Sequence, residues 1–135
     1  DSLIREKKAT VRFHVLSFLG DESVRAANAS FCAADEGQYL DFHHALYAVQ
    51  SPLENSGFWS NETLIAIGAK IGIKSDKFTK CVSDGEKVDL VKANYDSMPQ
   101  FGVQGTPTVF INGKLWERTN PNFDLGEFST AVEAG

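Results

Sequence analysis

The stretch GTPTVFING, residues 105–113, decides the fold of this chain. Its second half is rich in β-branched and aromatic side chains, and Asn112-Gly113 is a favoured two-residue hairpin turn. A proline that opens such a strand has no backbone N–H to give to a sheet. The stretch therefore predicts a strand over residues 108–111, a turn, and a second strand over residues 114–117.

Six amphipathic segments surround this hairpin, five before it and one after it. In most of them apolar side chains recur three or four residues apart, as on one face of a helix. Serine or aspartate stands at four of the starts, and glycine at two of the ends, where helix caps are expected. Glu127, three residues after Asp124, predicts a capping box. The expected helices cover residues 23–34, 38–49, from Ser60 to Gly72, from Ser75 to Gly85, 86–97, and from Asp124 onward.

A further strand is expected near the start of the chain, within residues 9–19. Val11, Phe13 and Val15 would share one of its faces. Its second half is apolar on both faces, which is typical of a strand covered from both sides. The order is then strand, helices, hairpin and helix, which predicts one α/β domain over residues 1–135.

Composition excludes several classes of function. The chain has 42% hydrophobic and 23% charged residues, as in ordinary globular proteins. A net charge of −5 argues against a nucleic-acid partner. No zinc-ligand spacing and no glycine-rich phosphate loop are present, so we expect neither metal nor cofactor. The chain opens on Asp1 and not on Met, which predicts a processed form or a fragment.

The two cysteines, Cys32 and Cys81, lie in separate predicted helices. Three interpretations are open: two buried free thiols, a structural disulfide, or a redox-active pair. A disulfide between helices is favoured, because two cysteines on neighbouring helices fit an extracytoplasmic protein. Closing a loop of about 50 residues would stabilise the fold by ~4 kcal/mol in the chain-entropy model.

The three histidines are weaker candidates for chemistry. His43 lies on a helix between Tyr39 and Tyr47, so a half-buried packing role is favoured over metal binding. His14 lies inside the predicted first strand without a carboxylate near it in sequence. His44 adjoins His43 and brings no further ligand type. Nothing resembles a Ser–His–Asp set.

Several stretches together resemble the DsbA-like branch of the thioredoxin family, in particular its actinobacterial cell-envelope oxidoreductases. They are RAANA at residues 25–29, GQY at 37–39, FHHALY at 42–47 and GVQGTPTVFING at 102–113. The resemblance extends from Thr10 to Val132. It implies a thioredoxin-like fold with a DsbA-type helical insertion over residues 22–101. Residues 105–135 would then hold the cis-proline strand, the hairpin and the C-terminal helix.

This chain departs from the family at the catalytic motif. The family has a strand leading into Cys-x-x-Cys at a helix N-terminus, and no such motif occurs here. The resemblance therefore implies that the first βα unit is missing and that no catalytic residue lies in this chain. The missing strand would leave a gap between residues 11–19 and 108–111. We expect a retained N-terminal fragment, a strand-swapped dimer or a rearranged sheet to fill it.

The resemblance implies that the parent protein is a thiol–disulfide oxidoreductase outside the cytoplasm. It would act on reduced or unfolded secreted polypeptides through a mixed disulfide and would need a redox partner protein. In this chain, Gly105, Thr106 and Pro107 would bind substrate, and Cys32 and Cys81 would form a structural disulfide. The chain alone should be inactive. The alternatives are a non-catalytic thioredoxin-like peptide-binding module or a relative of kappa-type glutathione transferases and isomerases.

Overall fold

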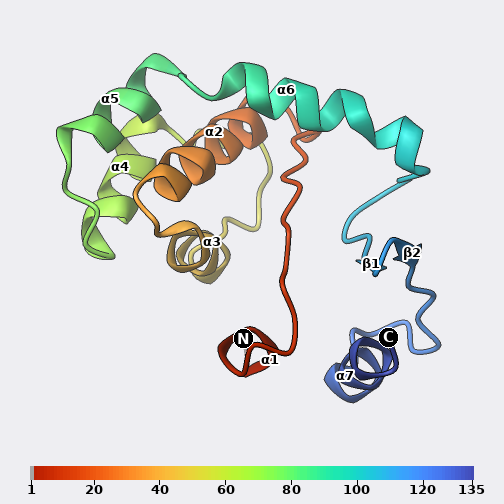
Figure 1. The fold of residues 1–135 in the computed structure, drawn as a ribbon. Helices are drawn as coiled ribbons and strands as arrows, with labels where there is room; N and C mark the ends of the chain where they lie inside the picture. Colours follow the sequence, from red (N-terminus) through yellow and green to blue (C-terminus); the bar gives the residue numbers. More distant parts are fainter. Residues whose placement is uncertain (1) are drawn as a thin grey trace. The chain divides into compact units, whose positions relative to one another are not determined.

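The computed structural model describes residues 2–135, and the chain divides into two compact units. The first consists of residues up to His14 together with Pro99–Gly135, and the second of Val15–Met98. Figure 1 shows the elements along the chain. They are α1 (Ser2–Arg5), α2 (Asp21–Asp35), α3 (Tyr39–Ala48), α4 (Asn61–Lys70), α5 (Asp76–Asp84), α6 (Val88–Ser97), the 3-10 helix η1 (Met98–Phe101), β1 (Phe110–Ile111), β2 (Lys114–Leu115) and α7 (Leu125–Glu133).

The helical unit, Val15–Met98, is built around α2. This helix contacts α3, α4, α5 and α6, and Figure 1 shows it among them. Its alanine-rich sequence lets the neighbouring helices approach closely, and Ala29 and Ala33 are completely buried. No helix in residues 2–135 is long and apolar enough to cross a membrane.

The core of the helical unit is aromatic and aliphatic. The side chains of Phe42, Leu64 and Phe78 are fully buried, each from a different helix. The rings of Phe42 and Phe78 meet edge to face with their centroids 5.8 Å apart, an arrangement that adds to the stabilisation from burial alone. Burial of this cluster holds α3, α4 and α5 together.

Local signals define the helix ends. The Ser60 side chain accepts a hydrogen bond from the backbone N–H of Thr63, and Ser75 accepts one from that of Phe78. Gly85 closes α5 in the left-handed conformation. The predicted caps at Ser60 and Ser75 are therefore confirmed, and each satisfies an N–H that the helix itself leaves unpaired.

A buried asparagine joins α2 to the turn between α5 and α6. Asn28 donates to the carbonyls of Cys81 and Val82, at 3.5 and 3.4 Å, and accepts from the backbone N–H of Lys87 at 2.8 Å. The Lys87 ammonium also lies 2.7 Å from the Asp35 carboxylate. The Asn28 side chain thus forms hydrogen bonds with backbone groups that would otherwise be buried without a partner.

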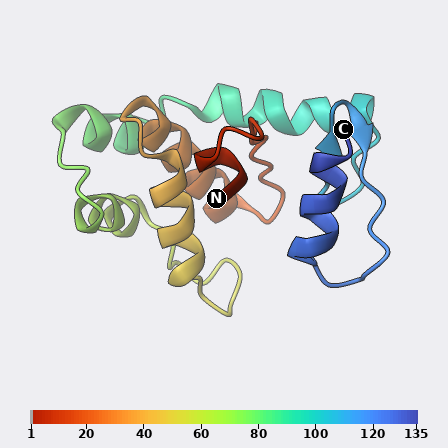
Figure 2. The same cartoon turned by 60° about the horizontal axis from the view of Figure 1, so that its bottom comes forward.

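The second unit contains the hairpin. Phe110 pairs with Leu115 and Ile111 with Lys114 in an antiparallel register. Asn112 and Gly113 have φ angles of 48° and 81°, as a type I′ turn requires. Figure 2 shows the hairpin beside α7.

An aromatic contact fixes the hairpin on α7. The indole of Trp116 lies 5.3 Å from the ring of Phe128 and 6.1 Å from that of Phe123. The guanidinium of Arg118 covers the ring of Phe123 at 4.2 Å. One face of the hairpin is therefore packed against the helix and its preceding loop.

The capping box predicted at α7 forms only in part. Asp124 accepts a hydrogen bond from the backbone N–H of Glu127, as expected of a cap. The Glu127 carboxylate turns instead to the preceding loop, where it accepts from the backbone N–H groups of Thr119, at 2.6 Å, and Asn120, at 3.3 Å. The bond from Thr119 is the main cause that lowers the pKa of Glu127. Loop and helix are thus tied together by one side chain.

The strand predicted within residues 9–19 does not form. That segment has no β-bridge, and the sheet in the described residues has only two strands, β1 and β2. The hairpin strands are also shorter than the predicted ranges 108–111 and 114–117. A strand needs a neighbour for its N–H and C=O groups, and its own sequence does not supply one. What lies in the predicted gap beside residues 108–111 stays a prediction.

Candidate functional site

The loop Gly105–Thr108 leads through Val109 into β1. The peptide bond between Thr106 and Pro107 is cis. The hydroxyl of Thr108 donates a hydrogen bond to the Gly105 carbonyl at 2.6 Å and so closes the loop on itself. Gly105, Thr106 and Pro107, the three residues predicted to bind substrate, are all exposed and lie next to one another.

The backbone of this loop has unused hydrogen-bonding groups. Within the described residues, no hydrogen bond engages the N–H or the C=O of Thr106. Pro107 contributes no N–H. The loop therefore offers one donor and one acceptor to an incoming chain, with no competing donor at the next residue.

The outer edge of β1 continues the same pattern. The backbone N–H of Trp116 donates to the Val109 carbonyl at 2.9 Å. The backbone N–H and C=O groups of Val109 and Ile111 therefore point toward β2. By the alternation of an antiparallel pair, the N–H and C=O of Phe110 face away from β2. Thr106 therefore offers backbone groups with which an extended peptide can pair. The outer edge of β1 at Phe110 is the edge beside which the missing strand is expected from the sequence.

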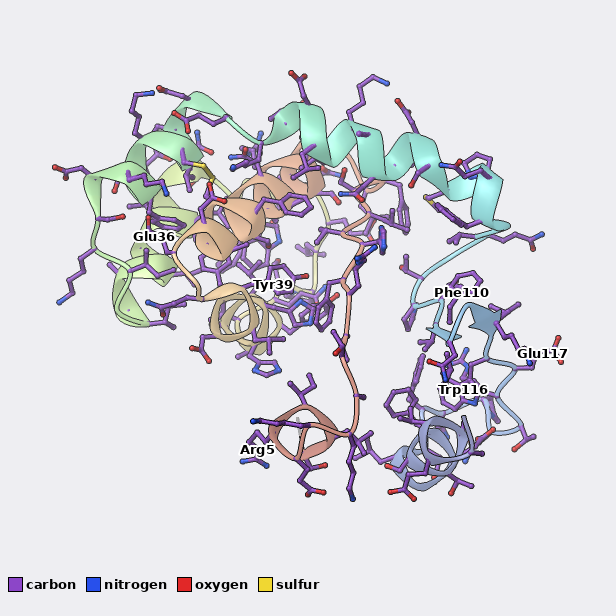
Figure 3. The ribbon with its side chains drawn as sticks, in the orientation of Figure 1. Arg5, Glu36, Tyr39, Phe110, Trp116 and Glu117 are labelled. Atoms are coloured by element: carbon purple, nitrogen blue, oxygen red, sulfur yellow. A yellow bond between two sulfur atoms is a disulfide. The ribbon has the colours of Figure 1, made fainter. Side chains whose placement is uncertain are left out.

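An apolar cross-strand pair lies on the face of the hairpin opposite α7. Phe110 is 42% exposed and its partner Leu115 is 54% exposed. Figure 3 shows Trp116 on the α7 side of the hairpin and Phe110 on the other. This pair was not predicted from the sequence, although the hairpin register already places both residues on one face.

The two cysteines are joined. The Sγ atoms of Cys32 and Cys81 lie 2.06 Å apart and link α2 to α5 (Figure 3). Cys32 is 1% exposed and Cys81 is 3% exposed, so the bond is inside the core of the helical unit. No free cysteine remains. A buried disulfide gives an external thiolate no access to its sulfur atoms.

The histidines of α3 pack against tyrosines. The ring of His43 lies 5.8 Å from that of Tyr39 and 4.9 Å from that of Tyr47. Burial, and then the neighbouring His44, lower the pKa of His43, while burial raises the pKa of Tyr39 to about 12. His14 is exposed. Within residues 2–135 no three His, Cys, Asp or Glu side chains gather as a metal site.

These features define a mostly helical chain with a cis-proline loop and a small two-stranded hairpin. The sequence model of the family described as Thioredoxin matches residues 2–134. The chain therefore belongs to the thioredoxin family, in its DsbA-like branch. No solved structure matches it significantly.

Curated relatives include a probable disulfide bond formation protein, a serine/threonine-protein kinase and a Na(+)/H(+) antiporter. The chain is 27% identical over 129 residues to a probable disulfide bond formation protein D of Bacillus anthracis, covering 92% of this chain and 57% of that protein. It is 24% identical over 137 residues to serine/threonine-protein kinase PknE of Mycobacterium tuberculosis, covering 91% and 24%. It is 29% identical over 110 residues to Na(+)/H(+) antiporter NhaA 1 of Mycolicibacterium gilvum, covering 82% and 17%. The chain thus spans between a sixth and somewhat over half of these relatives.

Proposed function

We propose that this chain is the substrate-docking part of a DsbA-like thiol–disulfide oxidoreductase that acts outside the cytoplasm. The observation that carries the proposal is the exposed Thr106 before the cis Pro107, whose backbone N–H and C=O have no hydrogen bond within the described residues. A reduced or unfolded polypeptide adds there as an extended strand, and its backbone pairs with the unused N–H and C=O groups. Backbone pairing accepts many sequences, which suits a protein that acts on diverse unfolded chains.

The chemical step belongs to a cysteine pair, in its disulfide form, outside these 135 residues. In the parent protein, a thiolate of the bound substrate attacks a disulfide sulfur of the enzyme and forms a mixed disulfide. The second substrate thiolate then releases the oxidised substrate and leaves the enzyme dithiol reduced. A redox partner protein removes those two electrons. Membership of the DsbA-like branch and the similarity to a probable disulfide bond formation protein support this proposal.

The disulfide between Cys32 and Cys81 favours a second candidate function, a peptide-binding module without catalysis. Cys32 and Cys81 are bonded to each other and buried, so the chain itself offers no nucleophilic sulfur. An insulin-reduction assay on the purified chain should therefore show no activity above the background rate. Activity equal to that of a Cys-x-x-Cys enzyme would contradict the structural role of this pair.

Peptide docking is tested by NMR with a short unstructured peptide in which serine replaces cysteine. The amide signal of Thr106 should shift on addition of the peptide, while that of Ile111, which faces β2, should move less. A matched peptide with one backbone N–H replaced by an ester oxygen should bind about fivefold more weakly, since one hydrogen bond is worth ~1 kcal/mol. Equal binding of both peptides, or shifts confined to the helical unit, would refute docking at Thr106.

A further inference from the structure

Asn112 and Gly113, the turn residues between β1 and β2, are exposed to solvent. Within the described residues, no hydrogen bond engages the Asn112 side chain. A Cβ added at Gly113 would meet no atom of a non-adjacent residue within 4 Å, so the space around it is open. The turn thus combines an unengaged carboxamide, a following residue without a side chain, and access to water.

This combination is what deamidation of an asparagine requires. The backbone nitrogen of Gly113 attacks the side-chain carbonyl carbon of Asn112 and loses its proton. Ammonia leaves, and the new C–N bond closes a cyclic imide. Water then opens the imide at either carbonyl and gives aspartate or isoaspartate, in which the backbone runs through the side-chain carbon. Glycine favours the attack, because it has no Cβ to crowd the nitrogen.

The other asparagines of the chain each lack one of these features. Asn28 is buried, and the Asn55 amide donates to the Leu19 carbonyl at 2.9 Å. Asn120 precedes Pro121, whose nitrogen carries no hydrogen to lose. The remaining ones precede Glu, Tyr or Phe, whose side chains crowd the nitrogen; they are Asn61, Asn94 and Asn122. Only Asn112 precedes a glycine.

The folded turn keeps the two reacting atoms apart. Asn112 and Gly113 have φ angles of 48° and 81°. In a type I′ turn the ψ of the first turn residue is roughly 30°, so the next nitrogen nearly eclipses that residue's own nitrogen. About the Cα–C bond it then lies roughly 90° or more from the Cβ, whereas the imide needs it to eclipse the Cβ. Ring closure therefore has to wait until the turn opens.

The hairpin that holds the turn is small. β1 and β2 are two residues each, and a two-stranded hairpin is marginally stable by itself. The contact between the rings of Trp116 and Phe128, 5.3 Å apart, holds the hairpin on α7. We propose that Asn112 is the site at which this chain deamidates first, and that opening of the hairpin sets the rate.

The modification changes the structure next to β1. Isoaspartate adds one carbon to the backbone between the strands, so a two-residue turn no longer matches the pairing of Phe110 with Leu115. Either product also adds a carboxylate to a chain whose net charge is already −5. The proposal does not depend on peptide docking at Thr106, and its failure would leave that docking unaffected.

The test incubates the full chain in warm, mildly alkaline buffer. Samples are digested at intervals, and tandem mass spectrometry measures at each asparagine the mass gain that accompanies replacement of an amide by an acid. Isoaspartate is counted separately by enzymatic methylation. Asn112 should convert first. Asn55, whose amide is hydrogen-bonded in the same chain, is the internal control and should stay intact over that period.

Two variants and a peptide test the control by the hairpin. Trp116→Ala removes the contact with α7 and should raise the conversion rate of Asn112 about tenfold. Leu125→Ala truncates a side chain of α7 that is 80% exposed and should leave the rate unchanged. A free peptide with the sequence of residues 106–118, which has no α7 to pack against, should convert faster than the intact chain.

Three results would overturn the proposal. Earlier conversion of another asparagine would show that Asn112 is not the preferred site. An unchanged rate in Trp116→Ala, or equal acceleration in Leu125→Ala, would show that the contact with α7 does not control the reaction. Conversion of the intact chain as fast as that of the peptide would show that the folded turn gives no protection.

Discussion

Removing the disulfide between Cys32 and Cys81 should destabilise the helical unit strongly. The bond joins residues 49 apart in sequence. For a loop of that length, the chain-entropy model gives ~4 kcal/mol of stabilisation through the unfolded state. With a urea slope of about 2 kcal/mol/M, the midpoint of unfolding should fall by roughly 2 M. The variant is Cys32→Ala with Cys81→Ala, which leaves no thiol to react.

The assay can report on the helical unit alone. The chain has two tryptophans, Trp59, which packs against the core of that unit, and Trp116, which lies in the other unit. In a Trp116→Phe background, fluorescence follows Trp59 only. A reductant should lower the midpoint of the protein that retains both cysteines and should not affect the double-alanine variant. A midpoint shift below about 0.5 M would refute the reasoning. With a urea slope of about 2 kcal/mol/M, such a shift assigns less than ~1 kcal/mol to the bond.

Three further perturbations test other contacts. Gly68→Ala would place a Cβ 2.8 Å from Cζ of the buried Phe78 ring, so the urea midpoint of the helical unit should fall by the equivalent of about 1–2 kcal/mol. Asn28→Ala leaves the N–H of Lys87 without its acceptor and should cost about 2 kcal/mol, part of which Asn28→Asp should recover in the same titration. The pKa of Glu127 is lowered in the folded chain. The stabilisation that its ionised carboxylate gives the folded state is therefore complete above the ordinary glutamate pKa and is lost as pH falls through the lowered pKa. Amide signals of the loop before α7 should shift over that acid range in the wild type and stay constant in Glu127→Gln.

The features that could be predicted from sequence are those determined locally. Ser60, Ser75 and Asp124 were predicted as caps, and each accepts a hydrogen bond from the backbone of its own first turn. Asn112-Gly113 was predicted as a hairpin turn, and both residues have the positive φ angles that this turn needs. A cap or a tight turn involves only residues within one turn of each other, so its sequence contains the whole cause.

The features that could not be predicted depend on residues far apart. Residues 9–19 have the composition of a strand but form no ladder, because composition does not determine the neighbour. Glu127 has the position of a capping-box residue, but its carboxylate binds the N–H of Thr119. The hydrogen bonds of Asn28 span more than 50 residues, and no periodic pattern indicates them.

The proposed docking at Thr106 can be tested apart from thiol exchange. Thr106 offers unused backbone groups and no sulfur, while both cysteine sulfurs are buried in the helical unit. A peptide that binds at Thr106 would meet no reactive thiol of this chain, so its affinity would come from backbone pairing. If binding requires a cysteine in the peptide, the recognition lies in sulfur chemistry and not in the loop. If a serine peptide binds equally well, the loop selects an extended, unfolded chain before any exchange takes place.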